Sequence, residues 1–172
     1  MARKEEEGMT TALLVLDMQT SLIADETPNP DEILDAVSGL VEVARGEGVP
    51  VVWVTDSRVS PDPAVHPGLA PSDEELKIVK DQRNAFEGTD LEAELTVLGI
   101  ERLVICGMQS DTCIHATVRA ADGFGFQVVL VSDAHTTHAF ESRDWRAVVA
   151  GENETLARLD NTSVLPLDEV VL

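Results

Sequence analysis

One cysteine stands where nucleophilic chemistry is favoured. Cys113 follows an apolar segment, Leu103–Cys106, by way of Gly107 and a short polar turn. Ser110 is a good N-cap residue, and it would place Cys113 in the first turn of the helix that we predict to follow. Unpaired backbone N–H groups and the helix dipole favour a negative charge there. The sequence therefore predicts that Cys113 is biased towards the thiolate, the nucleophilic form of cysteine.

A cysteine nucleophile needs a base or a cation beside it. Two charged residues end apolar segments: Asp17 follows Thr11–Leu16, and Lys80 follows Leu76–Val79. Lysine is scarce in this chain, so a lysine at a strand end is informative. Asp17 is placed to take the thiol proton, and Lys80 is placed to stabilise both the carboxylate and the thiolate.

Four histidines are alternative partners for the cysteine. His66 lies in a Pro-rich loop, and His115 is two residues from Cys113 on the predicted helix, so the latter two side chains point in different directions. His135 and His138 follow the fifth predicted strand and could approach the same edge of the sheet. A Cys–His pair stays open, but position favours the aspartate and the lysine. We interpret His135 and His138 as rim or loop residues.

Apolar segments and helical patterns alternate along the chain and set where these residues lie. Continuous apolar runs are typical of parallel strands buried on both faces, and capping and stop residues bound the helices between them. We predict strands over residues 11–16, 49–55, 76–79, 103–106, 127–132 and 163–165, and helices from 30 to about 46, over 89–98 and 111–121, and from about 142 to 159.

This alternation predicts an α/β fold: one domain over residues 1–172, three layers, and a doubly wound, Rossmann-like, mostly parallel six-stranded sheet. Residues 1–10 are expected to form a flexible tail. In such sheets the site lies outside the carboxyl ends of the strands. Asp17, Asp56, Lys80 and the turn before Cys113 all follow strand ends. The fold should therefore gather them at one edge of the sheet.

Charge and cysteine content exclude several classes of protein. The net charge of −20, from 12 basic and 32 acidic residues, argues against nucleic acids and anionic membranes as partners. The chain shows no membrane-spanning run and no apolar signal region, so we expect a cytoplasmic protein. Two cysteines do not make a disulfide framework. Cys106 lies in the apolar strand and is interpreted as a core residue.

Three segments together resemble the isochorismatase-like cysteine hydrolases. They are Leu13–Gln19, then Lys80 followed by Asn84–Phe86, then Gly107–Ile114. The segments stand in the family's order, and the resemblance extends from about residue 11 to about residue 165. This superfamily includes nicotinamidases, N-carbamoylsarcosine amidase and streptothricin hydrolase. The resemblance implies an isochorismatase-like fold and a hydrolytic activity.

The resemblance also implies roles for single residues. Asp17, Lys80 and Cys113 would form a catalytic triad. The peptide bond before Gln109 would be cis, and the backbone N–H groups of Gln109 and Cys113 would form an oxyanion hole. Cys113 would attack a carbonyl, Asp17 would pass the proton to the leaving amine, and water would cleave the thioester. A nucleophilic cysteine implies cleavage of a C–N bond in a small amide, lactam or carbamoyl compound.

One departure from the family bears on metals and on the substrate. Nicotinamidases carry a metal-binding Asp-x-His after the second strand, where this chain has Asp56-Ser57-Arg58. One aspartate and the isolated His66 do not make a transition-metal site. The sequence therefore predicts no metal and no other cofactor, and it disfavours nicotinamide as the substrate. Asp56, as a group for an amine, and the Gln109 side chain are candidate substrate-binding residues.

Other functions and the assembly stay open at this point. A non-catalytic or redox-sensing binding protein on the same fold, with Cys113 as an oxidisable thiol, is one alternative, and a nicotinamidase- or isochorismatase-type activity is another. The intact Asp–Lys–Cys set favours the amidase-type hydrolase. We expect a small-molecule substrate and a homodimer or homotetramer. Trp145, Val148 and Val149 mark a candidate interface.

Overall fold

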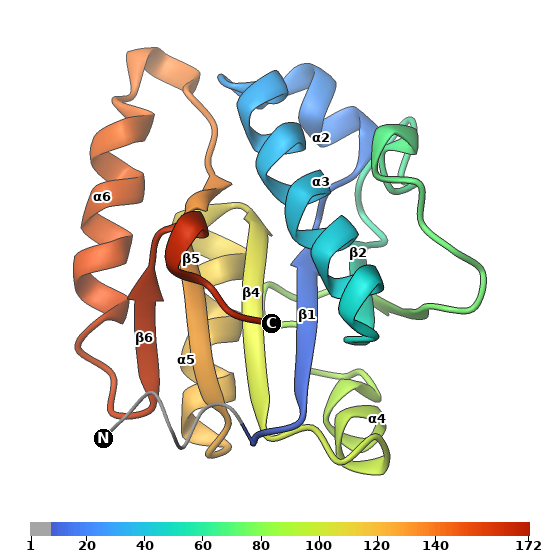
Figure 1. The fold of residues 1–172 in the computed structure, drawn as a ribbon. Helices are drawn as coiled ribbons and strands as arrows, with labels where there is room; N and C mark the ends of the chain where they lie inside the picture. Colours follow the sequence, from blue (N-terminus) through green and yellow to red (C-terminus); the bar gives the residue numbers. More distant parts are fainter. Residues whose placement is uncertain (1–7) are drawn as a thin grey trace.

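The fold is a single six-stranded parallel sheet with helices on both faces (Figure 1). It is seen in a computed structural model that describes residues 8–172, so most of the predicted tail, residues 1–10, lies outside the described residues. The strand order is β3-β2-β1-β4-β5-β6. The strands are β1 (Thr11–Leu16), β2 (Val51–Asp56), β3 (Leu76–Lys80), β4 (Arg102–Met108), β5 (Gln127–Thr136) and β6 (Thr162–Leu165). The predicted α/β class and parallel sheet are confirmed.

Within residues 8–172, four of the five α-helices agree with the predicted ones, and the short α2 was not predicted. The five are α2 (Thr20–Asp25), α3 (Pro30–Glu47), α4 (Leu91–Val97), α5 (His115–Gly123) and α6 (Trp145–Leu156). Helix α3 begins at Pro30 as predicted, and Gly48 ends it with a left-handed φ of 73°, a conformation that glycine adopts without a steric penalty. The unpredicted helix, α2, has only six residues and no side-chain cap to mark its start.

Two helix starts differ from simple N-capping. The hydroxyl of Thr89 donates to the carbonyl of Ala85 and accepts from the Leu91 N–H at 3.3 Å, whereas the side chain of Asp90, the N-cap residue of α4, makes no cap bond. Ser110 does not cap the helix that carries Cys113. That segment starts instead with one turn of π-helix, Ser110–Ile114, which runs into α5. The Ser110 hydroxyl bonds to His135 on β5, because a serine buried beside another strand has a tertiary partner within reach.

Both faces of the sheet are covered by apolar side chains. Residues of α4, α5 and α6 pack on one face, and residues of α2 and α3 pack on the other. Trp53 and Phe86 belong to these layers. Every residue of β1 and of β4 is buried, which explains why their sequences are continuously apolar rather than alternating. The layers hold the strand ends that carry the site.

Strands β4 and β5 extend beyond the apolar runs that predicted them. After a register shift between Ile105 and Gly107, Gly107 pairs with His135 and Met108 pairs with Thr136. His135 and Thr136 are polar yet buried, so an apolar pattern does not reveal this part of the strand. The extension brings β5 alongside the residues that precede the Cys113 turn.

The region predicted as an interface lies on α6. Leu156 is buried, whereas Trp145, Val148 and Val149 are half-buried, and Arg146 stacks on the Trp145 ring at 4.3 Å. Assembly through this helix stays a prediction. Within residues 8–172, no helix has both the length and the apolar character needed to cross a membrane.

Candidate active site

A close approach of two strands builds the floor of the site. Gly107 on β4 pairs with Leu16 on β1, and its φ is 116°. A Cβ atom at this position would collide with the backbone of Leu16. Glycine is therefore required at residue 107, because no side chain fits and because other residues avoid this φ. The contact brings the ends of β1 and β4 together.

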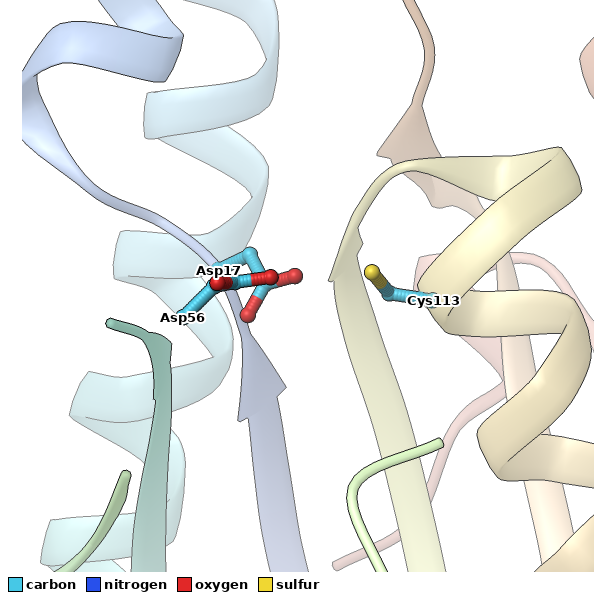
Figure 2. A group of neighbouring side chains, drawn as sticks. All are labelled: Asp17, Asp56 and Cys113. Atoms are coloured by element: carbon cyan, nitrogen blue, oxygen red, sulfur yellow. The ribbon is translucent and has the colours of Figure 1, made fainter. Parts of the chain in front are cut away.

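Asp17 is the first residue after β1. Its φ of 53° lies in the left-handed region, which is uncommon for a residue with a side chain and is found more often for aspartate than for most others. Its backbone N–H donates to the carbonyl of Val54 on the neighbouring strand. Only 2% of Asp17 is exposed. This turn aims the carboxylate across the end of the sheet towards Cys113 (Figure 2).

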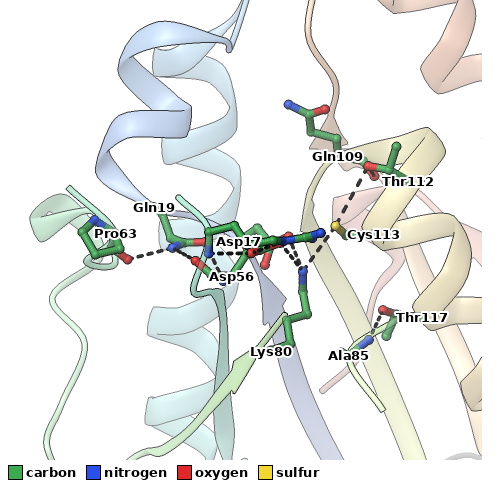
Figure 3. A network of polar contacts seen from close by, with 11 residues as sticks. Asp17, Gln19, Asp56, Pro63, Lys80, Ala85, Gln109, Thr112, Cys113 and Thr117 are labelled. Carbon is green, nitrogen blue, oxygen red and sulfur yellow. Dashed lines mark hydrogen bonds and ion pairs between the residues drawn. The ribbon is translucent and has the colours of Figure 1, made fainter. Parts of the chain in front are cut away.

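Lys80 ends β3, the edge strand, and its side chain reaches across the end of β2 to meet residues from β1 and β4 (Figure 3). The Nζ atom lies 3.0 Å from Asp17 Oδ2, 3.2 Å from Asp56 Oδ2 and 3.4 Å from Cys113 Sγ. Lys80 is 1% exposed. A buried ammonium with two carboxylates around it is a paired charge, the form in which buried charges are tolerated.

Cys113 lies in the turn that follows β4. The peptide bond between Met108 and Gln109 is cis, the isomer that the resemblance implies. The single π-helical turn from Ser110 to Ile114 then turns the thiol towards Lys80, and Thr112 Oγ1 lies 4.0 Å from the sulfur. Cys113 is buried. The sequence prediction that Asp17, Lys80 and Cys113 meet at one edge of the sheet agrees with this geometry.

Asp56 is held from several sides. Arg58 Nη2 donates to Asp56 Oδ2 at 2.6 Å and Arg58 Nε to Oδ1 at 2.9 Å. Lys80 Nζ also donates to Oδ2. The Gln19 side chain bonds both the N–H and the carbonyl of Asp56, at 2.9 and 3.0 Å. Both carboxylate oxygens are thus engaged by cations of the protein, so we revise the expected role of Asp56 from binding an amine to holding Lys80.

The protonation states differ from the expected thiolate. Burial raises the pKa of Cys113 to about 11, and the nearby Asp17 carboxylate adds to the rise. Burial also raises the pKa of Asp17, although the Lys80 ammonium opposes this. Burial would lower the pKa of Lys80, but the charges around it outweigh burial and raise it. At neutral pH the group therefore contains a thiol beside an ammonium, and the prediction of a low-pKa thiolate is wrong because burial disfavours a charged sulfur.

Asp17, Asp56 and Cys113 also form a cluster that resembles a metal site. One ligand atom from each lies within 4.8 Å of the other two (Figure 2). The Lys80 ammonium, however, bonds to all three side chains (Figure 3). An ammonium already occupies the position that a metal ion would take, so the donor set does not fit a metal. Asp17 Oδ1 is buried and accepts no hydrogen bond from residues 8–172, which suits an oxygen that receives a proton.

The Gln109 side chain is fixed by a residue that the sequence analysis did not single out. Gln109 Nε2 donates to Glu26 Oε2 at 2.6 Å. Glu26 lines a hollow of about 230 Å³ between α2 and the segment after β2, and Asp56 and Arg58 line it as well. Glu26 was missed because its contact with Gln109, 83 residues away, leaves no trace in local sequence patterns. Arg58 was missed because its pairing with Asp56 depends on the conformation of the turn after β2.

The partners of the Cys113 sulfur among the described residues include Lys80 and Thr112 but none of the four histidines. His135 is only 3% exposed, so its interpretation as a rim residue is wrong: β5 extends through it and buries it. The other three have partners elsewhere: His66 accepts from the Gly68 N–H, His115 bonds Glu152 at 2.7 Å, and His138 bonds Arg143. A Cys–His pair is therefore not formed.

A parallel α/β fold with a buried Cys–Lys–Asp group at the carboxyl edge of its sheet defines the class of this protein. Residues 11–150 match the family model described as the isochorismatase domain. The chain belongs to the isochorismatase family, and it is an isochorismatase-family hydrolase. The resemblance of the three sequence segments is thereby confirmed.

Relatives and solved structures agree with this assignment. The chain is 34% identical to the streptothricin hydrolase of Streptomyces noursei over 137 residues, 74% of this chain and 50% of that protein. It is 29% identical to the N-carbamoylsarcosine amidase of Arthrobacter sp over 129 residues, 60% of this chain and 49% of that protein. The chain thus spans about half the length of both relatives. A crystal structure described as an isochorismatase, from Pseudomonas putida KT2440, superposes with a TM-score of 0.83 at 26% identity, covering 94% of this chain and 90% of that one.

Proposed function

We propose that this protein is a cysteine hydrolase that cleaves a C–N bond of a small amide, lactam or carbamoyl compound. The observation that carries the proposal is the position of Lys80 Nζ, between Asp17 Oδ2 at 3.0 Å and Cys113 Sγ at 3.4 Å. A nucleophile, a cation and a carboxylate with a free oxygen are thus collected in one buried place. These are the groups that acyl transfer through a covalent intermediate requires.

The first half of the reaction makes a thioester. The Cys113 sulfur attacks the substrate carbonyl as its proton passes to Asp17, so the C–S bond forms and the carbonyl oxygen takes the negative charge. Backbone N–H groups of Gln109 and Cys113 are the donors that we assign to this oxyanion. Asp17 then gives the proton to the leaving nitrogen, the C–N bond breaks, and the amine departs. The Lys80 ammonium balances the charge on Asp17 or sulfur throughout.

The second half restores the enzyme. Asp17, again a carboxylate, takes a proton from a water molecule that attacks the thioester carbonyl. The C–S bond breaks, the carboxylic or carbamic acid leaves, and the proton on Asp17 returns to the sulfur. A carboxyl group whose pKa is raised by burial suits both steps, because a raised pKa makes the carboxylate a better proton acceptor than an exposed aspartate.

Two further observations support cleavage of a C–N bond. An amine is a poor leaving group unless it is protonated, and Asp17 carries the proton from the thiol to the place where it is needed. One relative is named an amidase.

Turnover of a compound panel tests the proposal. Small primary amides, N-carbamoyl amino acids and lactams would be offered, and released ammonia or amine would be measured. We expect turnover of at least one compound class, its loss in Cys113→Ala, and its retention in Cys106→Ala. Intact mass spectrometry should find an acyl group on the protein. Turnover that persists in Cys113→Ala, or a parent protein inert towards the whole panel, would contradict the proposal.

The assembly is a separate proposal. We propose a homodimer or homotetramer that includes the half-buried apolar residues of α6. Light scattering would give the mass in solution, and Trp145→Glu should shift it towards the monomer. A monomer mass for the parent protein would contradict this assembly.

A further inference from the structure

Three consecutive hydrogen bonds link the Cys113 turn to helix α6. Asn153 Nδ2 on α6 donates to the Ser132 carbonyl at 3.1 Å. The Asn153 Oδ1 oxygen lies 2.8 Å from His135 Nε2, and His135 Nδ1 lies 2.8 Å from Ser110 Oγ. Ser110 is fully buried and His135 is 3% exposed. Neither residue takes part in the chemistry proposed above.

The donor and the acceptor in each of these three hydrogen bonds follow from the groups involved. A backbone carbonyl only accepts, so the amide nitrogen of Asn153 faces Ser132 and its oxygen faces His135. His135 Nε2 must therefore carry the hydrogen. In a neutral imidazole the other nitrogen then accepts, so the Ser110 hydroxyl donates to Nδ1. Burial lowers the pKa of His135, which keeps the ring neutral at physiological pH.

These hydrogen bonds matter because of where Ser110 lies. Ser110 directly follows Gln109, whose N–H we assign to the oxyanion, and it opens the π-helical turn that carries Cys113. His135 pairs in the sheet with Gly107, two residues before Gln109. The hydrogen bond therefore joins the start of the turn to a strand that is already fixed against β4. Errors of about 1 Å in such donors can cost about 100-fold in rate.

We propose that His135 is a positioning residue that holds the oxyanion-binding turn in place through Ser110. The inference rests on the proposed function, since it assumes that Cys113 attacks a carbonyl. Loss of the bond should leave the thiol as reactive as before, because Lys80 and Asp17 contact it directly. It should weaken binding of an oxyanion, because the N–H groups of the turn lose their fixed direction.

Two measurements that need no substrate separate these effects. Iodoacetamide alkylates the thiol without forming an oxyanion, so its rate on Cys113, read by peptide mass spectrometry, reports the nucleophile. Propionaldehyde adds reversibly: the sulfur bonds to the aldehyde carbon, and the thiol proton ends on the oxygen, which lies at the oxyanion position. Its inhibition constant, measured as protection of Cys113 from alkylation, reports how well the N–H groups of the turn bind an oxygen at the oxyanion position.

The variants form a matched set. We expect His135→Phe and Ser110→Ala each to change the alkylation rate less than about threefold, and to weaken inhibition by propionaldehyde about tenfold or more. The double variant should be no weaker than either single one, because both remove the same bond. His135→Gln, which keeps one donor and one acceptor, should recover most of the loss. His115→Ala removes another histidine that bonds α6 and should change neither measurement.

Each other outcome has a definite meaning. Ser110→Ala removes a single oxygen atom, so it decides the matter if His135→Phe does not fold. Unchanged inhibition in Ser110→Ala, with inhibition intact in the parent protein, overturns the role of His135 alone. An additive double variant overturns the claim that His135 acts through Ser110. A parent protein that propionaldehyde does not inhibit contradicts the nucleophile itself, and with it the positioning role.

Discussion

Lys80 and Asp56 are register partners at the ends of neighbouring strands, and their charged atoms lie 3.2 Å apart. The same lysine meets Asp17 and Cys113, which come from the ends of two other strands. One ammonium therefore unites four segments of the chain. Asp56, itself bound by Arg58, holds the lysine, and the same Nζ contacts the Cys113 thiol and the Asp17 carboxylate.

Removal of this ammonium should affect both activity and stability. Lys80→Met leaves the buried carboxylates without their cation, so we expect turnover to fall at least about 1000-fold and the free energy of unfolding to fall by about 3 kcal/mol. Urea denaturation and turnover assays would measure these losses. Lys77→Met is the control: Lys77 lies on the same strand, is exposed and pairs with the exposed Asp73, so its loss should cost less than about 0.5 kcal/mol. Equal effects of the two variants would contradict this role of Lys80.

The Asp17→Asn variant should move two measurements in opposite directions. The Asp17 carboxylate contributes to the raised pKa of Cys113, so its neutralisation should lower that pKa and speed alkylation by iodoacetamide at pH 8. Turnover should fall about 1000-fold or more, because the proton carrier is lost. Alkylation rates of Cys113 across pH 7 to 11 would test the sign. Slower alkylation in Asp17→Asn would mean that the carboxylate activates the thiol even for this reagent.

A methyl group at residue 107 should be poorly tolerated. Gly107→Ala would collide with the Leu16 backbone at a φ of 116°, so we expect a loss of about 3 kcal/mol or more in unfolding free energy, or failure to fold. Gly39→Ala is the matched control, because residue 39 lies within α3 with nothing within 4 Å of the added Cβ. There the exchange should stabilise the protein by about 0.5 kcal/mol. Thermal unfolding of both variants decides; a Gly107→Ala protein as stable as the parent would refute the close approach.

Glu75 should contribute stability that depends on pH. It accepts bonds from Arg45, the Trp53 indole and the Ser72 N–H. Burial works to raise its pKa, but these bonds outweigh burial and lower the pKa to about 2 from the ordinary 4.5. A lowered pKa means a contribution that is complete above pH 4.5 and is lost as pH falls towards 2.

The variant Glu75→Gln tests this contribution. At pH 7 we expect it to be less stable than the parent by about 1 to 3 kcal/mol, with the difference shrinking below pH 4.5. Urea unfolding followed by tryptophan fluorescence would show it, with the exposed neighbour Glu74→Gln as the control. A difference that stayed constant from pH 7 to pH 3 would rule out the charged form of Glu75 as its source.

The sequence was sufficient to predict the sheet and the meeting of the three candidate site residues. Continuous apolar runs mark strands buried on both faces, and parallel strands bring their carboxyl ends to one edge, so the pattern alone places Asp17, Lys80 and Cys113 together. The end of β5 could not be predicted in this way. His135 and Thr136 satisfy their polar groups through tertiary contacts, and such contacts leave no period in the sequence.

The pKa shift of Cys113 was predicted in the wrong direction for a similar reason. A turn before a helix favours a thiolate, but desolvation opposes it, and the degree of burial depends on segments far away in the sequence. Arg58 illustrates a different limit, which is the local conformation of the backbone. Its neighbour Asp56 was singled out, whereas the pairing between them follows from the turn after β2.

The position of Lys80 on an edge strand makes catalysis vulnerable in a particular way. Strand β3 has a single neighbour in the sheet, and edge elements with exposed faces open at lower free energy than central strands. Fraying of β3 would move the Lys80 ammonium away from Cys113 while β1 and β4 stay folded. Activity should then disappear at urea concentrations where circular dichroism still reports an intact fold. The protein would lose the Lys80 charge from its site before it unfolds globally.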